Sequence, residues 1–145
     1  MFTHLLNNSD KIFAVEFSDY SKRHFLKRFE KSYKGKQWAV TYDSIIQDIS
    51  RIRTSVSDLQ HRQQVDELYH KDNFWIFKYD FRIAGTNEST KTSGNRCVVF
   101  IDENCNKMEI LLIYGKIDLP KNITETQYIN NVLKNEFHQY LVKCR

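Results

Sequence analysis

Apolar side chains recur at helical spacing in two stretches that follow a short apolar run near the start of the chain. The run at 11–18 is rich in β-forming residues, which predicts a first strand. Residues 19–35 and 36–52 each carry an apolar stripe with polar residues on the remaining surface, which predicts two amphipathic helices. Gly35 can end the first helix because glycine adopts the left-handed conformation of many helix ends, and so short a connection favours an antiparallel hairpin. The stripes comprise Phe25, Leu26, Phe29 and Tyr33, and then Trp38, Tyr42, Ile45, Ile46, Ile49 and Ile52.

The pattern changes to a period of two farther along the chain. Residues 54–73 are polar, and 57–70 within them fit a further short helix. Residues 73–85 then alternate between apolar and polar side chains, which predicts a strand with one buried face and one polar face. The buried face would carry Phe77, Tyr79, Phe81 and Ile83, and the polar face Lys78, Asp80 and Arg82.

Two further apolar runs and a capped helix complete the pattern. Runs at 95–103 and 108–116, separated by a short polar turn, predict two more strands and, with the preceding one, an antiparallel meander. Thr124 and Gln127 have the spacing of a capping box, which marks the start of a terminal helix. The apolar stripe of that helix comprises Tyr128, Val132, Leu133, Phe137 and Leu141.

The composition is that of a single folded domain, 1–145. Of the 145 residues, 41% are hydrophobic and 28% are charged, which is enough to bury a core. No stretch has the features of a signal peptide or reaches the roughly 20 apolar residues of a membrane span. The three cysteines lack a CxxC spacing and the five histidines are scattered, so no disulfide framework, metal site or cofactor is expected. We therefore expect a reduced, cytoplasmic protein that does not contact the membrane.

Basic residues are concentrated between positions 21 and 36, in a chain whose net charge is +4. Such a patch either attracts a polyanion or is the solvated face of a helix. Glu30 is the one acidic residue of this segment, which contains Lys22, Arg23, Lys27, Arg28, Lys31, Lys34 and Lys36.

A second set of basic and aromatic side chains lies at the ends of the predicted strands. Arg82 shares the polar face of its strand, Arg96 opens the next strand directly behind a polar loop, and Tyr114 and Lys116 share a face of the strand after that. A guanidinium group matches two oxygens of a phosphate. Such groups at neighbouring strand ends therefore favour a phosphate-binding site.

The segment 79–136 resembles the RelE/ParE toxin superfamily, and most of all its HigB-like branch of ribosome-dependent mRNA interferases. The resemblance lies in "YDFRIAG", in the loop and strand "TKTSGNRCVVFIDE", and in "ILLIYGKIDLPKNITETQ". It implies an α+β, RelE-like two-layer fold: a curved antiparallel sheet with a helical hairpin on one face, a C-terminal helix, and a basic site on the concave face. It also implies a type II toxin that cleaves mRNA on the ribosome without a metal, inhibits translation and is bound by a cognate antitoxin.

The same resemblance implies roles for individual residues. Arg82 and Arg96 would bind the scissile phosphate, and Lys91 would position the backbone or lower the pKa of the attacking hydroxyl. Lys116 would belong to the same cluster, and Tyr114 would be a proton donor, a surface for base stacking or a packing residue. Contacts to RNA or the ribosome are expected from Lys22, Lys27, Lys31, Lys34 and Lys78.

Other interpretations stay open at this point. Arg82 could be a solvated strand residue, and Arg96 could pair with Asp102 or Glu103 in the hairpin. The loop "GTNESTKTSG" holds one lysine and one glutamate, fewer basic residues than several members of the family have. A non-catalytic protein of the same fold, either a gyrase inhibitor or a binding module with a decayed site, is therefore the alternative.

Overall fold

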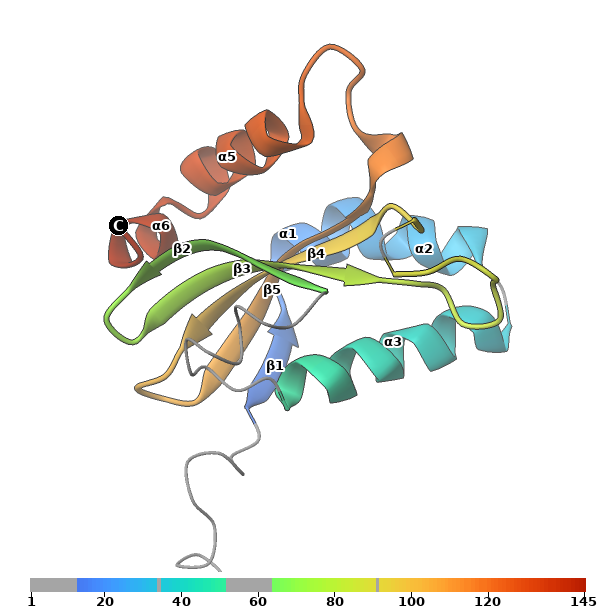
Figure 1. Ribbon diagram of the computed structural model, residues 1–145, viewed down its shortest axis with the longest axis horizontal. Coiled ribbons are helices and arrows are strands. Elements are labelled where there is room, and N and C mark those ends of the chain that lie inside the picture. The colour runs from blue at the N-terminus through green and yellow to red at the C-terminus, as the bar shows by residue number, and fades with distance from the viewer. Residues whose placement is uncertain (1–12, 34, 52–63, 91) are drawn as a thin grey trace, which may run out of the picture.

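The sheet that the structure describes has five strands in the order β1-β5-β4-β3-β2. The computed structural model describes residues 13–33, 35–51, 64–90 and 92–145, arranged as in Figure 1. Strands β2 to β5 pair with one another in antiparallel orientation, whereas β1 pairs in parallel with β5, so the sheet is mixed. The strands are β1 (Ala14–Phe17), β2 (Val65–Lys71), β3 (Phe74–Phe81), β4 (Asn95–Asp102) and β5 (Lys107–Gly115).

Helices lie on both sides of this sheet (Figure 1). The predicted helical hairpin is confirmed, although its first helix is composed of three short pieces, the middle one a π-helix. The terminal helix is also confirmed and is divided at Phe137. The helices are α1 (Asp19–Ser21), the π-helix η3 (Lys22–Leu26), α2 (Lys27–Ser32), α3 (Lys36–Ser50), the 3-10 helix η4 (Lys116–Asp118), α5 (Glu125–Glu136) and α6 (His138–Lys143).

The prediction of a short helix over residues 57–70 is wrong in the part of this segment that the structure describes. Val65–Lys71 forms β2, an edge strand paired antiparallel with β3; residues before 64 lie outside the described part. A register shift between Glu67 and Tyr69 interrupts the alternation of side chains, which removes the period-two signal of a strand. The hairpin turn begins at Asp72, whose φ of 54° lies in the left-handed region that aspartate tolerates.

Two apolar clusters show how the sheet is covered. On one side, Phe29 of α2 and Ile49 of α3 pack against inward-facing strand residues such as Phe77. On the other side, Leu133 of α5 and Leu141 of α6 pack in a second cluster. The second side of the sheet, where the basic site is expected, is therefore covered in part by α5 and α6, because the apolar stripe of the terminal helix packs against it.

The start of α5 has the capping box that the sequence predicts. The Thr124 amide donates to Gln127 Oε1 at 2.9 Å, and the Gln127 amide donates to Thr124 Oγ1 at 3.1 Å. These bonds satisfy backbone donors that a helix N-terminus otherwise leaves open. The cap thus determines where α5 begins, and it places Glu125 as the first residue of the helix. None of the described helices is both long and apolar enough to cross a membrane.

Candidate anion-binding site

A row of three polar side chains crosses the central strands of the sheet. Asp80 of β3 is directly opposite Arg96 of β4, and Arg96 is directly opposite Tyr114 of β5. Residues opposite each other on neighbouring strands project to the same face. The three side chains therefore lie side by side on the face that α5 covers.

Arg96 is buried in this row and paired with carboxylates. It is 7% exposed, with its Nε 3.1 Å from Asp80 Oδ1 and 3.4 Å from Glu125 Oε2. Asp102 and Glu103, the alternative partners considered for Arg96, lie at the opposite end of β4. Arg96 pairs with Asp80 and Glu125 instead. Although the Asp80 contact is close, its geometry is not that of a hydrogen bond: neither Asp80 Oδ1 nor Arg96 Nε has a hydrogen-bond partner among the described residues. The guanidinium thus keeps an unused donor in a buried site.

Glu125 connects this row to the N-terminus of α5. Besides Arg96, its carboxylate accepts a hydrogen bond of 2.7 Å from the Tyr114 hydroxyl and lies 3.7 Å from Lys78 Nζ. Lys78 also lies 3.8 Å from Asp66 Oδ2 on the edge strand. A carboxylate at the first turn of a helix is favoured by the helix dipole. One anionic group of the chain itself is therefore held by Arg96, Tyr114 and Lys78 together.

The electrostatics of the row follow from burial. Burial raises the pKa of Asp80, and the nearby charges of Arg96 and Lys78 lower it by a smaller amount. The pKa of Tyr114 is raised well above its ordinary value, first by burial and then by its hydrogen bond to Glu125. Tyr114 is consequently a neutral phenol that directs its proton toward a carboxylate. Its ring is fully buried, so in this arrangement it offers no face to a base.

Arg82 and Lys116 lie at the same end of the sheet as Arg96. Phe81, Asn95 and Gly115 form the last register pairs of β3, β4 and β5, and both basic residues come directly after these pairs. Both are exposed. The Lys116 amide donates to the Gly94 carbonyl at 2.8 Å, and Arg82 Nη1 donates to the Thr86 carbonyl at 3.3 Å.

The antiparallel topology therefore places four of the five residues expected at the catalytic site at one end of the sheet. These four are Arg82, Arg96, Tyr114 and Lys116, and the fifth, Lys91, lies outside the described residues.

Arg28 also lies at this end, and the sequence interpretation did not include it among the site residues. Its guanidinium forms an ion pair with Asp118 of η4 and stacks over the Phe29 ring at 4.6 Å. A Cβ at Gly115 would lie 3.0 Å from Arg28 Nη2 and 3.2 Å from Asn95 Oδ1, so glycine gives these groups room. The sequence showed that Arg28 belongs to the basic segment between positions 21 and 36. Nothing in the sequence indicated that its side chain reaches the ends of the strands.

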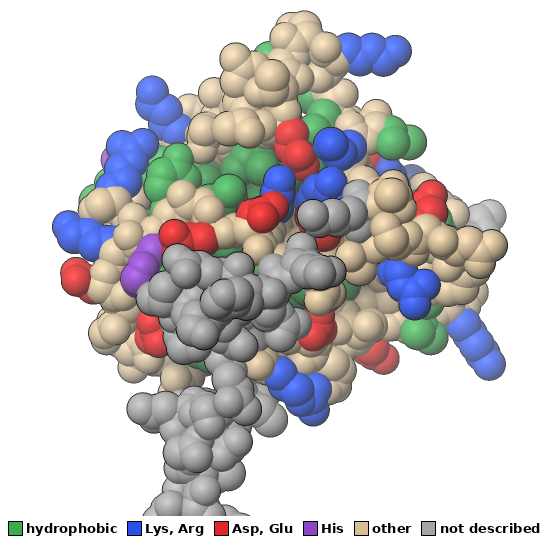
Figure 2. Space-filling model, in the orientation of Figure 1, with side chains coloured by type: hydrophobic (Ala, Val, Ile, Leu, Met, Phe, Trp, Pro, Cys, Tyr) green, Lys and Arg blue, Asp and Glu red, His purple; other side chains and the backbone are tan. Residues whose placement is uncertain are grey.

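The residues expected to contact RNA or the ribosome occupy two separate surfaces. Lys22, Lys27 and Lys31 are exposed on η3 and α2, whereas Lys78 points from β3 toward Glu125 on the side that α5 covers. Lys34 lies outside the described residues. In Figure 2, acidic and basic side chains alternate in the area below α5, so this area is not uniformly basic.

Among the described residues, no group of three or more His, Cys, Asp or Glu side chains is arranged to hold a metal ion. Cys97 of β4 is fully buried in the core. Burial also raises the pKa of its thiol well above the ordinary value, so this cysteine is a packing residue of β4.

Comparison with known proteins gives a structural likeness without sequence support. No family model matches the chain, and no curated protein matches it. A chain in the crystal structure of the archaeal RelE–RelB complex from Pyrococcus horikoshii OT3 is similar in fold. The match covers 74% of this chain and 99% of that one, with a TM-score of 0.46 and 9% sequence identity. A likeness of this degree assigns neither a family nor an activity.

Proposed function

We propose that this chain is a type II toxin that cleaves mRNA on the ribosome and thereby inhibits translation. The observation that carries the proposal is the end of the sheet where Arg96 lies directly opposite Tyr114, with Arg82 and Lys116 immediately after the last register pairs. The resemblance of residues 79–136 to HigB-like toxins supports the same activity. The expected location is the cytoplasm, where ribosomes and mRNA are present, and the expected partner is a cognate antitoxin.

The chemistry of such a site is attack of a ribose 2′-hydroxyl on the adjacent phosphorus. The attack forms a 2′,3′-cyclic phosphate, breaks the bond to the 5′-oxygen and releases the hydroxyl proton to solvent water. Arg96 would supply charge stabilisation, because a guanidinium donor in a buried site strengthens as negative charge builds on the phosphate oxygens. Arg82 and Lys116, which are exposed, would bind the flanking phosphates and help to position the strand. Tyr114 holds a proton near Arg96 and is the candidate donor to the leaving oxygen.

The carboxylate of Glu125 now occupies the position that this chemistry assigns to a phosphate oxygen. It contacts Arg96, Tyr114 and Lys78 at once, and a second anion beside it would be repelled. We therefore infer that RNA cleavage requires the Glu125 side chain to leave Arg96. Rotation of this side chain or displacement of the start of α5 would expose the guanidinium.

The test compares the natural chain with Arg96→Lys in cells and with purified ribosomes. Arg96→Ala alone is a poor test, because it leaves the buried carboxylate of Asp80 without the guanidinium beside it, at a cost of roughly 3–5 kcal/mol of stability. Arg96→Lys keeps the charge but removes the forked donor. We expect about a hundredfold slower mRNA cleavage, as for removal of one donor to a transition state, with unchanged circular dichroism. Cleavage at the natural rate by a folded Arg96→Lys protein would remove Arg96 from the mechanism.

One observation favours the second candidate, a non-catalytic protein of the same fold. Asp80 compensates the charge of Arg96 from within the sheet, and movement of α5 would not remove it. Primer extension on cellular mRNA distinguishes the two candidates: growth arrest without new mRNA 5′ ends favours the non-catalytic one. A DNA supercoiling assay with purified gyrase then separates a gyrase inhibitor from a binding module.

A further inference from the structure

A small cavity lies between the first half of α5 and strands β2 and β3, on the side of the sheet that carries Arg96. Its volume is about 150 Å³, below the range of about 300–1,000 Å³ that holds drug-sized ligands, so it suits a single ring. In Figure 2, hydrophobic side chains form a patch beside the alternating acidic and basic side chains below α5. The cavity is lined by Leu68, Tyr69, Lys78, Thr126, Ile129 and Asn130.

The walls of this cavity are mainly apolar and are held in place. Leu68 and Tyr69 are half-buried on β2, and Ile129 is buried on α5. The Tyr69 hydroxyl donates to Asn130 Oδ1 at 2.8 Å, which joins the edge strand to the helix at the cavity. The space is therefore formed before a ligand enters, which lowers the entropic cost of filling it.

Two hydrogen-bond donors of the lining remain available to a ligand. Asn130 Oδ1 is taken by Tyr69, but Asn130 Nδ2 makes no hydrogen bond within the described part of the chain. Lys78 Nζ lies 3.8 Å from Asp66 Oδ2 and 3.7 Å from Glu125 Oε1, which is too far for a direct hydrogen bond. Because these two carboxylates flank the one ammonium group, the cavity suits a neutral ring with acceptor atoms at its edge.

The cavity is connected to the anion-binding site through Lys78. The carboxylate of Glu125 lies 3.7 Å from Lys78 Nζ and 3.4 Å from Arg96 Nε. A phosphate that replaced this carboxylate would therefore lie within ion-pair distance of a residue that lines the cavity. The phosphate and the ring could then belong to one nucleotide.

We propose, building on the function proposed above, that this cavity binds the pyrimidine base of the nucleotide whose phosphate contacts Arg96. A pyrimidine is a single neutral ring with carbonyl acceptors at its edge, whereas a purine has two fused rings. Unstacked bases of RNA are commonly bound between apolar or aromatic side chains and hydrogen-bonded at their edges. Since α5 forms one wall, the base site requires that Glu125 leaves Arg96 by rotation of its side chain while the helix stays docked.

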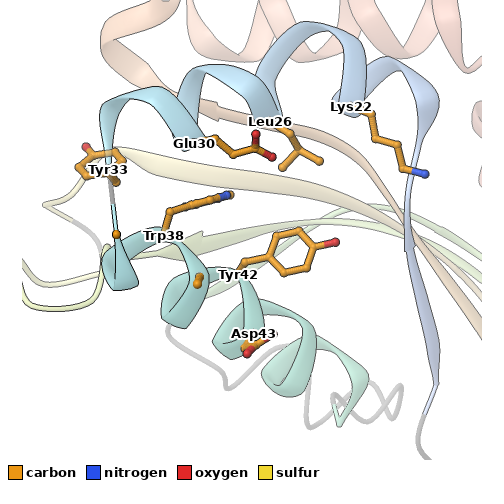
Figure 3. A pocket seen from close by; sticks show the side chains of 9 residues that line it. Lys22, Leu26, Glu30, Tyr33, Trp38, Tyr42 and Asp43 are labelled. Carbon is orange, nitrogen blue, oxygen red and sulfur yellow. The ribbon is translucent and has the colours of Figure 1, made fainter.

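A larger cavity, of about 610 Å³, does not belong to this binding site. Figure 3 shows it between the helices of the N-terminal hairpin, where Leu26, Trp38 and Tyr42 line it. These helices pack on the side of the sheet opposite α5. A nucleotide bound at Arg96 therefore cannot place its base there.

The experiment uses the full-length protein labelled with ¹⁵N, without ribosomes, and nucleosides as probes. We expect uridine and cytidine to shift the side-chain amide signal of Asn130 in a saturable manner, and adenosine to bind at least about fivefold more weakly because of its size. Uridine 3′-monophosphate should bind to Glu125→Gln about fivefold more tightly than to the natural chain, since a competing charge is removed. Uridine, which has no phosphate, should bind equally to both proteins.

Matched variants identify the groups that hold the base. Asn130→Ala should weaken uridine binding about tenfold, as for loss of one hydrogen bond, and Lys78→Met should cause a similar loss. Asn131→Ala, which alters an exposed asparagine of the same helix outside the cavity, should leave binding unchanged. Circular dichroism confirms that each variant is folded. Equal binding of uridine and adenosine, or no effect of Asn130→Ala, would overturn the proposal.

The base site and the proposed activity can fail separately, because binding of nucleosides is measured without cleavage. Saturable pyrimidine binding by a chain that cuts no mRNA would support the base site and refute the proposed function. Cleavage of mRNA by a chain that binds no pyrimidine nucleoside would support the function and overturn the base site.

Discussion

Glu125 Oε2 lies 3.4 Å from Arg96 Nε and also accepts a hydrogen bond of 2.7 Å from the Tyr114 hydroxyl. The first residue of a terminal helix is thereby joined to two residues in the centre of the sheet. A carboxylate and a phosphate compete for the same guanidinium donors. The contact therefore makes the position of α5 relevant to the proposed activity.

Replacing Glu125 by glutamine should increase affinity for RNA. The amide keeps the size of the side chain but removes the negative charge that opposes a phosphate near Arg96 and Lys78. We expect a five- to tenfold lower Kd for a fluorescently labelled RNA oligonucleotide in anisotropy titrations. Glu136→Gln, at the exposed other end of α5, is the matched control and should have no such effect. An unchanged or higher Kd for Glu125→Gln would show that this carboxylate does not limit access.

Reversing two of the exposed lysines on η3 and α2 should weaken RNA binding without altering the chemical step. Binding to phosphates releases counterions, so the logarithm of affinity falls linearly with the logarithm of salt concentration. The double variant Lys27→Glu, Lys31→Glu should flatten that slope by about one unit for each phosphate that the protein no longer neutralises. Lys121→Glu, on an exposed loop before α5, is the control. If slope and affinity both stay constant, this helix face is only solvated.

The stability of the protein should depend on the protonation of Asp80. Because its pKa is raised in the folded protein, the folded state keeps this proton to a higher pH than the unfolded state does. Ionised Asp80 therefore lowers stability above the raised pKa, and this cost is relieved as the pH falls toward the ordinary carboxyl range. Asp80→Asn removes the effect.

Urea unfolding over a series of pH values measures this linkage. Relative to Asp80→Asn, the natural protein should lose free energy of unfolding as the pH rises from about 4, by at most about 1.4 kcal/mol per pH unit for one proton. An Asp19→Asn variant, altered at an exposed carboxylate, corrects for the general effect of charge. Parallel curves for the natural and Asp80→Asn proteins would contradict the prediction.

Gly115→Ala should disturb the contact between Arg28 and Asp118. The added Cβ would lie 3.0 Å from Arg28 Nη2 and 3.1 Å from Asp118 Oδ2. The φ of Gly115, −100°, is accessible to alanine, so crowding is the cause of the expected destabilisation of about 1 kcal/mol. A double-mutant cycle with Arg28→Ala tests this cause, since the destabilisation should shrink when the guanidinium is absent. An equal effect in both backgrounds would place its cause elsewhere.

Local patterns in the sequence were sufficient to predict most of the elements. The hairpin helices, strands β3, β4 and β5 and the capped helix α5 each have a strong periodic or capping signal, and the structure confirms them. Strand β2 was missed because its bulge interrupts the alternation and its residues are mainly polar. The turn at Asp72, directly before Asn73, was the one local signal that could have indicated a hairpin.

For the site, the alternation of side chains along each strand could predict only which residues of that strand share a face. The antiparallel meander predicts that Arg96 and Tyr114 lie near the same end of the sheet, whereas their position directly opposite each other comes from the register that the structure shows. The same alternation predicted that Asp80 lies on the polar face of its strand. Its pairing with Arg96 depends on the register between β3 and β4, which the sequence does not show. The contacts of Glu125 and Arg28 depend on how helices dock on the sheet, and a single sequence carries no local signal for such docking.

The pairing of β1 with β5 has a consequence for the order of folding. Ala14 pairs with Lys107, so the first strand cannot join the sheet until nearly the whole meander has been synthesised. Contacts so distant in sequence form slowly because a long loop must close first. We expect the β2–β5 meander to acquire protection from hydrogen exchange before β1 does. The strand that is synthesised first is therefore expected to be the last to join the sheet.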